Sequence, residues 1–432
     1  QWTNGTADKG GGALYGAAQS RVDGSFMKVV RNKNTAVLFE GTSMQILLST
    51  FTTNSADQRS NDGGGAIHVR NGANVSLVRT TFEGNIATNK EGGDVACSGL
   101  STCTIQFTSF QGNEKSSDPL NGVEGSMLPS KGGAVAVLGG STAHISNTIF
   151  NRTYSKIGGG AISVSYSNLK MNQVEIHGAR SKKGAGLLLE NAIDVRIDST
   201  LFSTCISLYD GGAVHATDSV VVASNLQLLS NRAGIFGGAI LVSEKASFNL
   251  TNSTFQGNVA WLGGGLAMDR DSKASVTHTL FTDNQARMGG AFYVSVNENL
   301  VTFEHSLFAN NQARFGSALF IEFSYVNVED CIVKNNVATL FAAVRVTGVG
   351  GFSASSSLFQ SNLAQKGGAM YADDTTQVNL FNSTFAENVA EDDGGAIYCG
   401  GATDVKIYGC RFNANIAKQG QGGAVSRTNG AR

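Results

Sequence analysis

One stretch near the end of the chain contains the whole repeating pattern. Residues 367–400 read GGAMYADDTTQVNLFNSTFAENVAEDDGGAIYCG and run from one Gly-Gly-Ala motif to the next. Between the two motifs lies Phe385, and three residues later comes Asn388. Both motifs recur roughly every 26 residues along the chain. A unit this short cannot enclose a hydrophobic core, so it must stack on its neighbours.

Apolar and polar residues alternate beside the motifs, as at Val378 and Leu380 or at Val405 and Ile407. A period of two predicts β-strands, and the even spacing of the units leaves little room for helices. Strand and turn repeated in one direction predict parallel sheets with right-handed coiling. The predicted fold class is all-β, a single right-handed parallel β-helix of about 15 rungs. With rungs about 4.8 Å apart, it would form a rod roughly 70 Å long.

Each unit is expected to place one large apolar residue, usually Phe, at the same inward position. These positions are Phe26, Phe51, Phe82, Phe110, Phe150, Ile176, Phe202, Leu228, Phe255, Phe281, Phe308, Val333, Phe359, Phe385 and Phe412. In most units Asn follows three residues later, which predicts a ladder of amide hydrogen bonds between rungs. The paired glycines are expected at a corner where a Cβ does not fit.

The repeat predicts one continuous domain over residues 1–432, with two irregular places. The first rungs, within residues 1–62, are degenerate, because Asn34-Thr35-Ala36-Val37 fills a Gly-Gly-Ala position without glycines. Residues 113–131 hold both prolines and are expected to form an exposed loop insertion. The chain starts and stops within the repeat without capping units, so we expect it to be a segment of a larger protein.

The composition excludes several classes of protein. The net charge is −1, only 15% of residues are charged and no basic stripe is present, so no nucleic-acid partner is expected. No apolar run reaches the roughly 18 residues of a membrane helix, so direct membrane insertion is not expected. The six histidines are expected to be scattered over the surface, with His68 and His215 about five rungs apart. Neither they nor the six cysteines show metal-binding spacing, so no metal or other cofactor is expected.

An outward stripe of aromatic residues is the most informative surface feature. The residue after the Ile position of each Gly-Gly-Ala-Ile motif should point to solvent. In successive C-terminal units this residue is Tyr293, Phe320, Arg345, Tyr371 and Tyr398. Such a ladder could bind sugar rings or a partner protein. Alternatively, the rings only stabilise each other across rungs, since tyrosine favours strands.

Two kinds of covalent modification are predicted. Glycosylation motifs on outward or turn positions make Asn74, Asn249, Asn252 and Asn382 candidate sites. Cys97 and Cys103 flank a tight turn and both face inward by register, which makes them a candidate disulfide. A disulfide would fit an oxidising compartment.

Catalysis is not expected. A glycoside hydrolase would need paired carboxylates placed about a sugar, and adjacent acids occur at Asp373-Asp374 and Asp392-Asp393. Both pairs lie in corner segments, where acids mostly form solvated turns. Arg345 is a candidate base for a lyase, but no clustered acids share its position. A polysaccharide lyase or hydrolase therefore ranks below the non-catalytic alternatives.

The alternation of Gly-Gly-Ala-Ile and Phe-x-x-Asn resembles the repeats of the chlamydial polymorphic outer-membrane proteins, over nearly the whole chain. The resemblance implies a right-handed parallel β-helix that is secreted or surface-exposed and serves adhesion or a structural role. We therefore expect an extracellular or cell-surface rod, a segment of a larger surface or filament protein. Its partners would be other copies of itself, other surface or filament proteins, or glycans. The alternative is a polysaccharide-binding module that uses the aromatic ladder.

Overall fold

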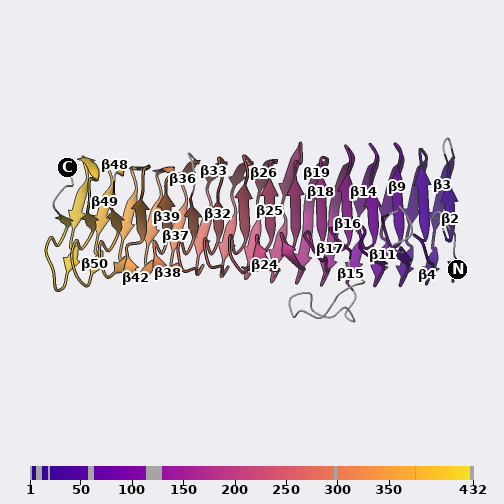
Figure 1. Cartoon of the computed structure of the whole chain (residues 1–432), viewed down its shortest axis with the longest axis horizontal. Helices are drawn as coiled ribbons and strands as arrows, with labels where there is room; N and C mark the ends of the chain where they lie inside the picture. The colour runs from indigo at the N-terminus through magenta and orange to yellow at the C-terminus, as the bar shows by residue number, and fades with distance from the viewer. Residues whose placement is uncertain are drawn as a thin grey trace. The chain divides into compact units, whose positions relative to one another are not determined.

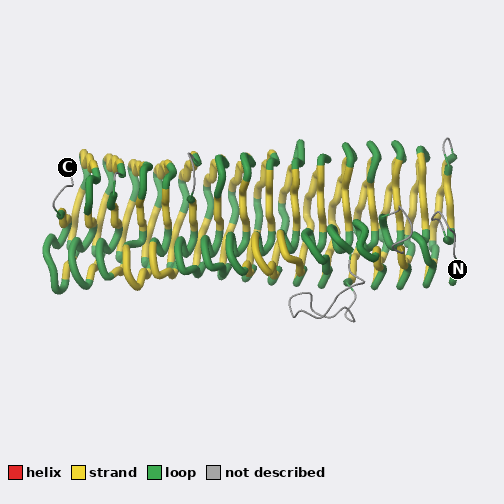
Figure 2. Tube along the Cα trace, in the orientation of Figure 1, coloured by secondary structure: helices red, strands yellow, loops and turns green. Residues whose placement is uncertain are grey.

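The computed structural model describes residues 2–5, 12–17, 20–56, 63–112, 129–295, 299–374 and 376–428. They belong to two compact units, Gln1–Val222 (unit 1) and Ala223–Arg432 (unit 2). The described residues form strands and turns without helices (Figure 2), in about 15 turns of right-handed parallel β-helix. The predicted all-β fold class is therefore confirmed. Within these ranges no helix could cross a membrane. Most of the expected loop insertion, residues 113–128, lies outside the described residues.

One turn of unit 2 illustrates the architecture (Figure 1). It contains β29 (Ile240–Ser243), β30 (Ser247–Thr251) and β31 (Thr254–Gln256), and an irregular segment then leads back to β32 (Leu266–Met268). Each strand pairs in parallel with its equivalent in the next turn, as Phe255 of β31 pairs with Phe281. Equivalent residues therefore form columns that run from turn to turn.

The strands that follow the glycine motifs form one sheet in each unit, which we call the GGA sheet. In unit 1 it contains β2 (Leu14–Gly16), β5 (Val37–Glu40), β9 (Ile67–Arg70), β13 (Val95–Cys97), β16 (Val135–Leu138), β18 (Ile162–Ser165), β21 (Leu187–Glu190) and β25 (Val214–Thr217). In unit 2 it contains β29, β32, β35 (Phe292–Val294), β39 (Leu319–Glu322), β43 (Val344–Thr347), β47 (Met370–Ala372), β51 (Ile397–Cys399) and β55 (Val425–Arg427).

The two glycines of the motif serve different purposes at the corner before this sheet. Gly394 has a φ of +68°, a conformation that residues with a side chain rarely adopt. Gly395 has no such φ, but a Cβ there would lie 2.1 Å from the carbonyl oxygen of Gly423 in the next turn. The expectation that a Cβ does not fit at this corner is confirmed.

A column of Phe rings fills the interior next to the GGA sheet. In unit 1 Phe110 and Phe150 stack with ring centroids 4.6 Å apart, and in unit 2 Phe255 and Phe281 stack at 4.5 Å. The assignment of Phe26 to this column is wrong. Phe26 lies in a turn with a φ of 55° and is exposed, whereas the buried Val29 pairs with Phe51.

The predicted Asn ladder is present, and each amide in its middle is fully hydrogen-bonded. The Oδ1 atom of Asn284 accepts bonds from the backbone N–H and the Nδ2 of Asn258, both at 3.0 Å. The Nδ2 of Asn284 donates to Asn311 Oδ1 at 3.0 Å and to the Phe255 carbonyl at 2.9 Å. These four bonds use both donors and both acceptor positions of the side chain. The ladder therefore holds consecutive turns in register without leaving a buried polar atom unpaired.

The ladder is less regular in unit 1. Asn32, Asn54 and Asn85 form it, but Asn85 then donates to the carboxyl group of Asp94 at 2.8 Å. Asp94 replaces the alanine of the glycine motif and is buried, and this burial raises the pKa of Asp94 to about 8. In later turns of unit 1 the Asn position holds Thr153, Ala179 and Cys205, which are all buried. These turns are held without the amide ladder.

Removing one amide from the middle of the ladder is expected to destabilise the protein strongly. Asn284→Ala leaves the Asn258 amide and the Phe255 carbonyl without their partners in the interior. We expect a loss of roughly 2–4 kcal/mol, measured by urea unfolding followed by circular dichroism. Asn249→Ala, which removes an exposed Asn from β30, is the matched control and should change stability by less than about 0.5 kcal/mol. Equal losses in both variants would contradict a stabilising role for the ladder.

Asp94 is expected to make stability fall as the pH rises. Its pKa is about 8 in the folded chain and near the ordinary value of 3.8 in the unfolded chain, so the folded state holds the extra proton. The resulting stabilisation is complete below pH 4 and is lost as the pH rises through 8, at up to about 1.4 kcal/mol per pH unit. Unfolding midpoints measured between pH 6.5 and 9 should therefore fall more steeply for the natural chain than for Asp94→Asn. Parallel pH profiles would show that the Asp94 carboxyl is not protonated in the folded state.

Candidate functional site

The outer face of the GGA sheet in unit 2 carries the predicted aromatic ladder. Tyr293 and Phe320 stack with ring centroids 5.5 Å apart, and Tyr371 and Tyr398 stack at 4.7 Å. Between these pairs, the guanidinium carbon of Arg345 lies 4.2 Å from the centre of the Tyr371 ring. We call this column the seam; from Leu241 to Tyr398 it comprises Leu241, Ala267, Tyr293, Phe320, Arg345, Tyr371 and Tyr398.

The expectation that the predicted ladder points to solvent is wrong for four of its five residues, and the fifth, Tyr371, is half-buried. Tyr293, Phe320 and Tyr398 are only 5%, 6% and 7% exposed, and Arg345 is 8% exposed. Their covering consists of the residues that directly precede the glycine position of each turn, which we call the ridge. The ridge comprises Phe236, Leu262, Met288, Phe315, Phe341 and Lys366. The seam is thus a hydrophobic layer outside the β-helix interior rather than an open face.

The ridge packs on the seam because both are columns with the same spacing. Bridges between consecutive turns align Phe236 with Leu262 and Phe315 with Phe341. The Phe341 ring then lies 4.4 Å from that of Tyr371, centroid to centroid. Sequence reasoning missed the ridge because it lies in the irregular segment of each turn, where alternation gives no register. A large apolar residue directly before Gly-Gly in successive units, as at Phe236 and Leu262, was the available signal.

Arg345 is the one cation of the seam, and it is paired. Its Nη2 lies 2.7 Å from Asp373 Oδ2, and its guanidinium also stacks over Phe341. Burial raises the pKa of Tyr371, while the positive charge of Arg345 opposes that rise. Hydrogen bonds from the Thr347 hydroxyl and the Gly348 N–H lower the pKa of Asp374. The acids at 373 and 374 therefore hold this corner together and are not a free pair of carboxyl groups.

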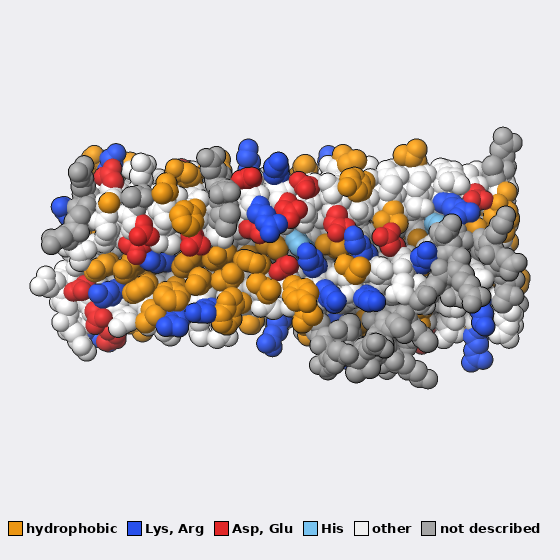
Figure 3. All heavy atoms as spheres, viewed as in Figure 1, with side chains coloured by type: hydrophobic (Ala, Val, Ile, Leu, Met, Phe, Trp, Pro, Cys, Tyr) orange, Lys and Arg blue, Asp and Glu red, His pale blue; other side chains and the backbone are white. Residues whose placement is uncertain are grey.

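A third column lies outside the ridge and is exposed. We call it the rim; it comprises Ile235, Trp261, Arg287 and Arg314, each of which directly precedes a ridge residue. Trp261 is 51% exposed, and the Arg287 guanidinium stacks over its indole at 4.7 Å. Arg314 stacks over the ridge residue Phe315 at 5.3 Å. Figure 3 shows a band of hydrophobic side chains in the C-terminal half of the chain, with basic side chains beside it. The rim is the most exposed of the three columns, and sequence reasoning did not identify it.

The outer face of the GGA sheet in unit 1 has a different chemistry. Its outer column contains His68, Ala96 and Leu188, and the ridge positions beside it include Glu91 and Lys131. A depression of about 310 Å³ lies there, lined by His68, Glu91 and Ala96 among others. Lys131 forms an ion pair with Glu190 at 2.5 Å. The described part of this face lacks the stacked aromatic rings of unit 2.

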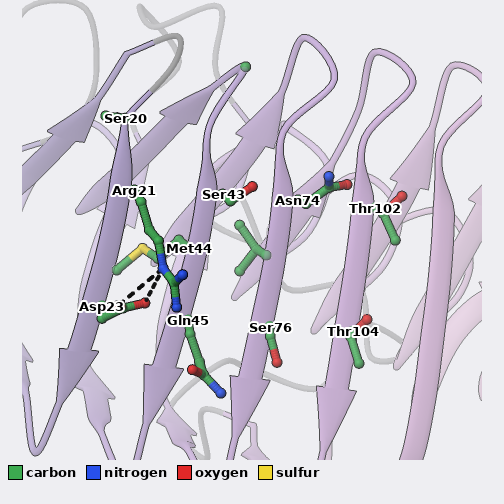
Figure 4. Close-up of a pocket in the computed structure, with 12 residues that line it drawn as sticks. Ser20, Arg21, Asp23, Ser43, Met44, Gln45, Asn74, Ser76, Thr102 and Thr104 are labelled. Atoms are coloured by element: carbon green, nitrogen blue, oxygen red, sulfur yellow. Dashed lines mark hydrogen bonds and ion pairs between the residues drawn. The ribbon is translucent and has the colours of Figure 1, made fainter.

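A second depression in unit 1 lies on the sheet built from β3 (Arg21–Ser25), β6 (Ser43–Leu47), β10 (Asn74–Val78) and β14 (Thr102–Gln106). It has a volume of about 580 Å³, and its lining includes Ser43, Gln45, Asn74, Ser76, Thr102 and Thr104 (Figure 4). Arg21 and Asp23 at its edge form an exposed ion pair at 3.2 Å. The lining offers hydroxyl and amide groups at regular spacing but no unpaired charge, so it gives little basis for a specific ligand.

The expectation that the histidines are scattered over the surface is wrong for His68 and His215, whereas His278 and His305 are exposed. His68 and His215 are buried, and burial lowers the pKa of His215 to about 3. His278 and His305 occupy equivalent turn positions, with ring centroids 4.9 Å apart, and His305 lies 3.8 Å from Asp330. In the described part of the chain, no group of three or more metal-binding side chains is placed to hold an ion.

The sites of covalent modification fall into two groups. Asn74, Asn249, Asn252 and Asn382 are all exposed, as expected for glycosylation sites. Cys97 and Cys103 are both buried, and both are free thiols in this structure. Burial raises the pKa of Cys103, which disfavours the thiolate needed for disulfide exchange. A hydrogen bond with the Cys97 thiol raises this pKa further, so the two thiols lie side by side and the candidate disulfide stays a prediction.

Comparison with protein families agrees with this architecture. The family described as the right-handed beta helix region matches residues 123–281 and 195–348, which together cover more than half of the chain. The Chlamydia polymorphic membrane protein repeat matches residues 382–400, which indicates a surface-associated protein. No curated protein matches the sequence. The chain belongs to the right-handed β-helix family.

Proposed function

We propose that the chain is a non-catalytic structural or adhesive part of an extracellular or cell-surface protein. The observation that carries the proposal is the Asn ladder of unit 2, in which the interior polar groups hold consecutive turns together. Such an interior supports a stiff scaffold whose outer columns are free to vary. The repeat match at residues 382–400 supports the surface location. The partners would be other copies of the chain, other surface or filament proteins, or glycans.

The acidic residues give little support to a catalytic role. Asp373 is paired with Arg345, and Asp393 lies 3.5 Å from Lys366. A general acid needs a raised pKa at working pH, whereas the pKa of Asp374 is lowered. Arg345 is almost fully buried beneath the ridge, which limits the access of a polymer to it. These contacts favour a structural role for the residues that a lyase or hydrolase would use.

The surface location predicts labelling of the chain on intact cells that produce it. A membrane-impermeant amine reagent should modify exposed lysines such as Lys273 and Lys406. The measurement is mass spectrometry of the labelled peptides, with a cytosolic protein of the same cells as the control. Labelling of the chain only after lysis would overturn the surface location. Exposed Asn74, Asn249, Asn252 and Asn382 would carry glycans if the chain passes through a eukaryotic secretory pathway.

The absence of catalysis predicts no release of reducing ends or unsaturated products from acidic polysaccharides. The natural chain and Arg345→Gln should both give the background rate over a day of incubation. The reason is that Asp373 is paired with Arg345, Asp393 lies 3.5 Å from Lys366 and the pKa of Asp374 is lowered, so these three carboxyl groups do not form the acid-base pair that hydrolysis needs. Turnover by the natural chain that Arg345→Gln abolishes would overturn the non-catalytic proposal in favour of a lyase or hydrolase.

A further inference from the structure

The rim of unit 2 carries positive charge that is not paired with any acid in the described part of the chain. Arg287 and Arg314 are both exposed, and neither forms an ion pair with any residue that the structure describes. Their successors Met288 and Phe315 are bridged across adjacent turns, so the two backbones lie about 4.8 Å apart. Two guanidinium groups in neighbouring turns repel each other, and an anion bound between them would relieve that repulsion.

Other charges near this surface are already paired. Arg345 is bound to Asp373, Lys366 lies 3.5 Å from Asp393, and Arg270 lies 3.9 Å from Asp269. Burial raises the pKa of Glu322, on the far side of the seam, which weakens its tendency to carry a charge. Among the described residues of the rim, the accessible charge without an ion-pair partner is that of Arg287 and Arg314.

The rim also offers flat apolar surface next to these charges. The indole of Trp261 is half-exposed and lies against Arg287, so its ring is held in place while part of it remains open. Ile235 extends the apolar surface by one turn, and the ridge rings lie directly behind it. A ligand that combines flat, weakly polar rings with carboxylate or sulfate groups matches this arrangement.

The backbone at the rim argues against an extended peptide as the ligand. Strand addition requires unpaired N–H and C=O groups at a sheet edge. At the rim, the backbone N–H of Arg287 bonds to the Trp261 carbonyl, and that of Arg314 bonds to the Arg287 carbonyl. A ligand here must be held by side chains alone. A polysaccharide, which needs no backbone ladder, suits such a surface better than a peptide strand.

We infer that the rim, through Trp261, Arg287 and Arg314, binds an anionic polysaccharide along successive turns of unit 2. The inference rests on the proposed surface location and specifies the glycan class that an adhesive role would use. Each guanidinium would donate to a carboxylate or sulfate of the polymer, and the indole would cover one face of a sugar ring. The buried seam would support the rim from behind without touching the ligand.

Binding of the whole chain to polygalacturonate, measured by biolayer interferometry, tests the inference. The natural chain should bind, and raising the salt concentration should weaken binding. Neutral dextran should bind at least tenfold more weakly than polygalacturonate. Arg287→Gln/Arg314→Gln should lose at least tenfold in affinity, and Trp261→Ser should lose severalfold. Arg287→Lys/Arg314→Lys should regain part of the loss, because the charge returns without the planar stacking group.

The matched control removes the same charge elsewhere on unit 2. Lys273→Gln/Lys406→Gln, with both lysines exposed on other strands, should bind within twofold of the natural chain. Equal losses in both double variants would reveal only net-charge attraction and overturn the rim as a site. Equal binding of polyglutamate, lost in the same rim variant, would assign the rim to acidic peptides instead. A chain that is labelled on intact cells but does not bind polygalacturonate would overturn this inference and leave the proposed location standing.

Discussion

Hydrogen bonding between equivalent residues of successive turns is the constraint on which the rest of the structure depends. Parallel pairing aligns the backbones, and the Asn side chains repeat that alignment inside each unit. An amide is suited to this position because it both donates and accepts, so each copy satisfies the one before it and the one after it. A shift of one residue would leave buried donors and acceptors unpaired, which is costly. Register is therefore strongly determined in the turns that carry the ladder.

Because the register is fixed, residues about one repeat apart in sequence contact each other in consecutive turns. Tyr371 and Tyr398 are far apart in sequence, yet their rings stack because both follow the same glycine motif. The same alignment brings Arg287 beside Trp261 and His278 beside His305. Any chemistry on the surface of this protein is thus a property of columns rather than of local motifs. The aromatic character of unit 2 arises from three such columns, the seam, the ridge and the rim.

Sequence reasoning succeeded where the residue pattern has a period. The fold class, the Phe column, the glycine corner and the Asn ladder all follow from repeated positions, and the structure confirms them. It placed Phe26 in the core because the first turn has Val29 there, and a single Val gives no motif to align. Sequence reasoning also predicted that residues on the outer side of each GGA-sheet strand contact solvent. Tyr293 and Phe320 are buried because the irregular segment of each turn, which carries the ridge, packs over them, and alternation within a strand carries no information about that segment.

Inward and outward residues alternate within each strand, so the sequence of the exposed outer positions can change in evolution independently of the inner ones. Inward residues of a strand such as β30 contribute to the columns, whereas Asn249 between them contacts solvent. Substitutions on the outer side therefore leave the register of the turns unaffected and alter only what the surface presents. Selection can therefore change the exposed outer residues of one unit while the inner columns stay the same. A scaffold of this kind separates the requirements of folding from those of recognition, so new binding specificities can arise without new folds.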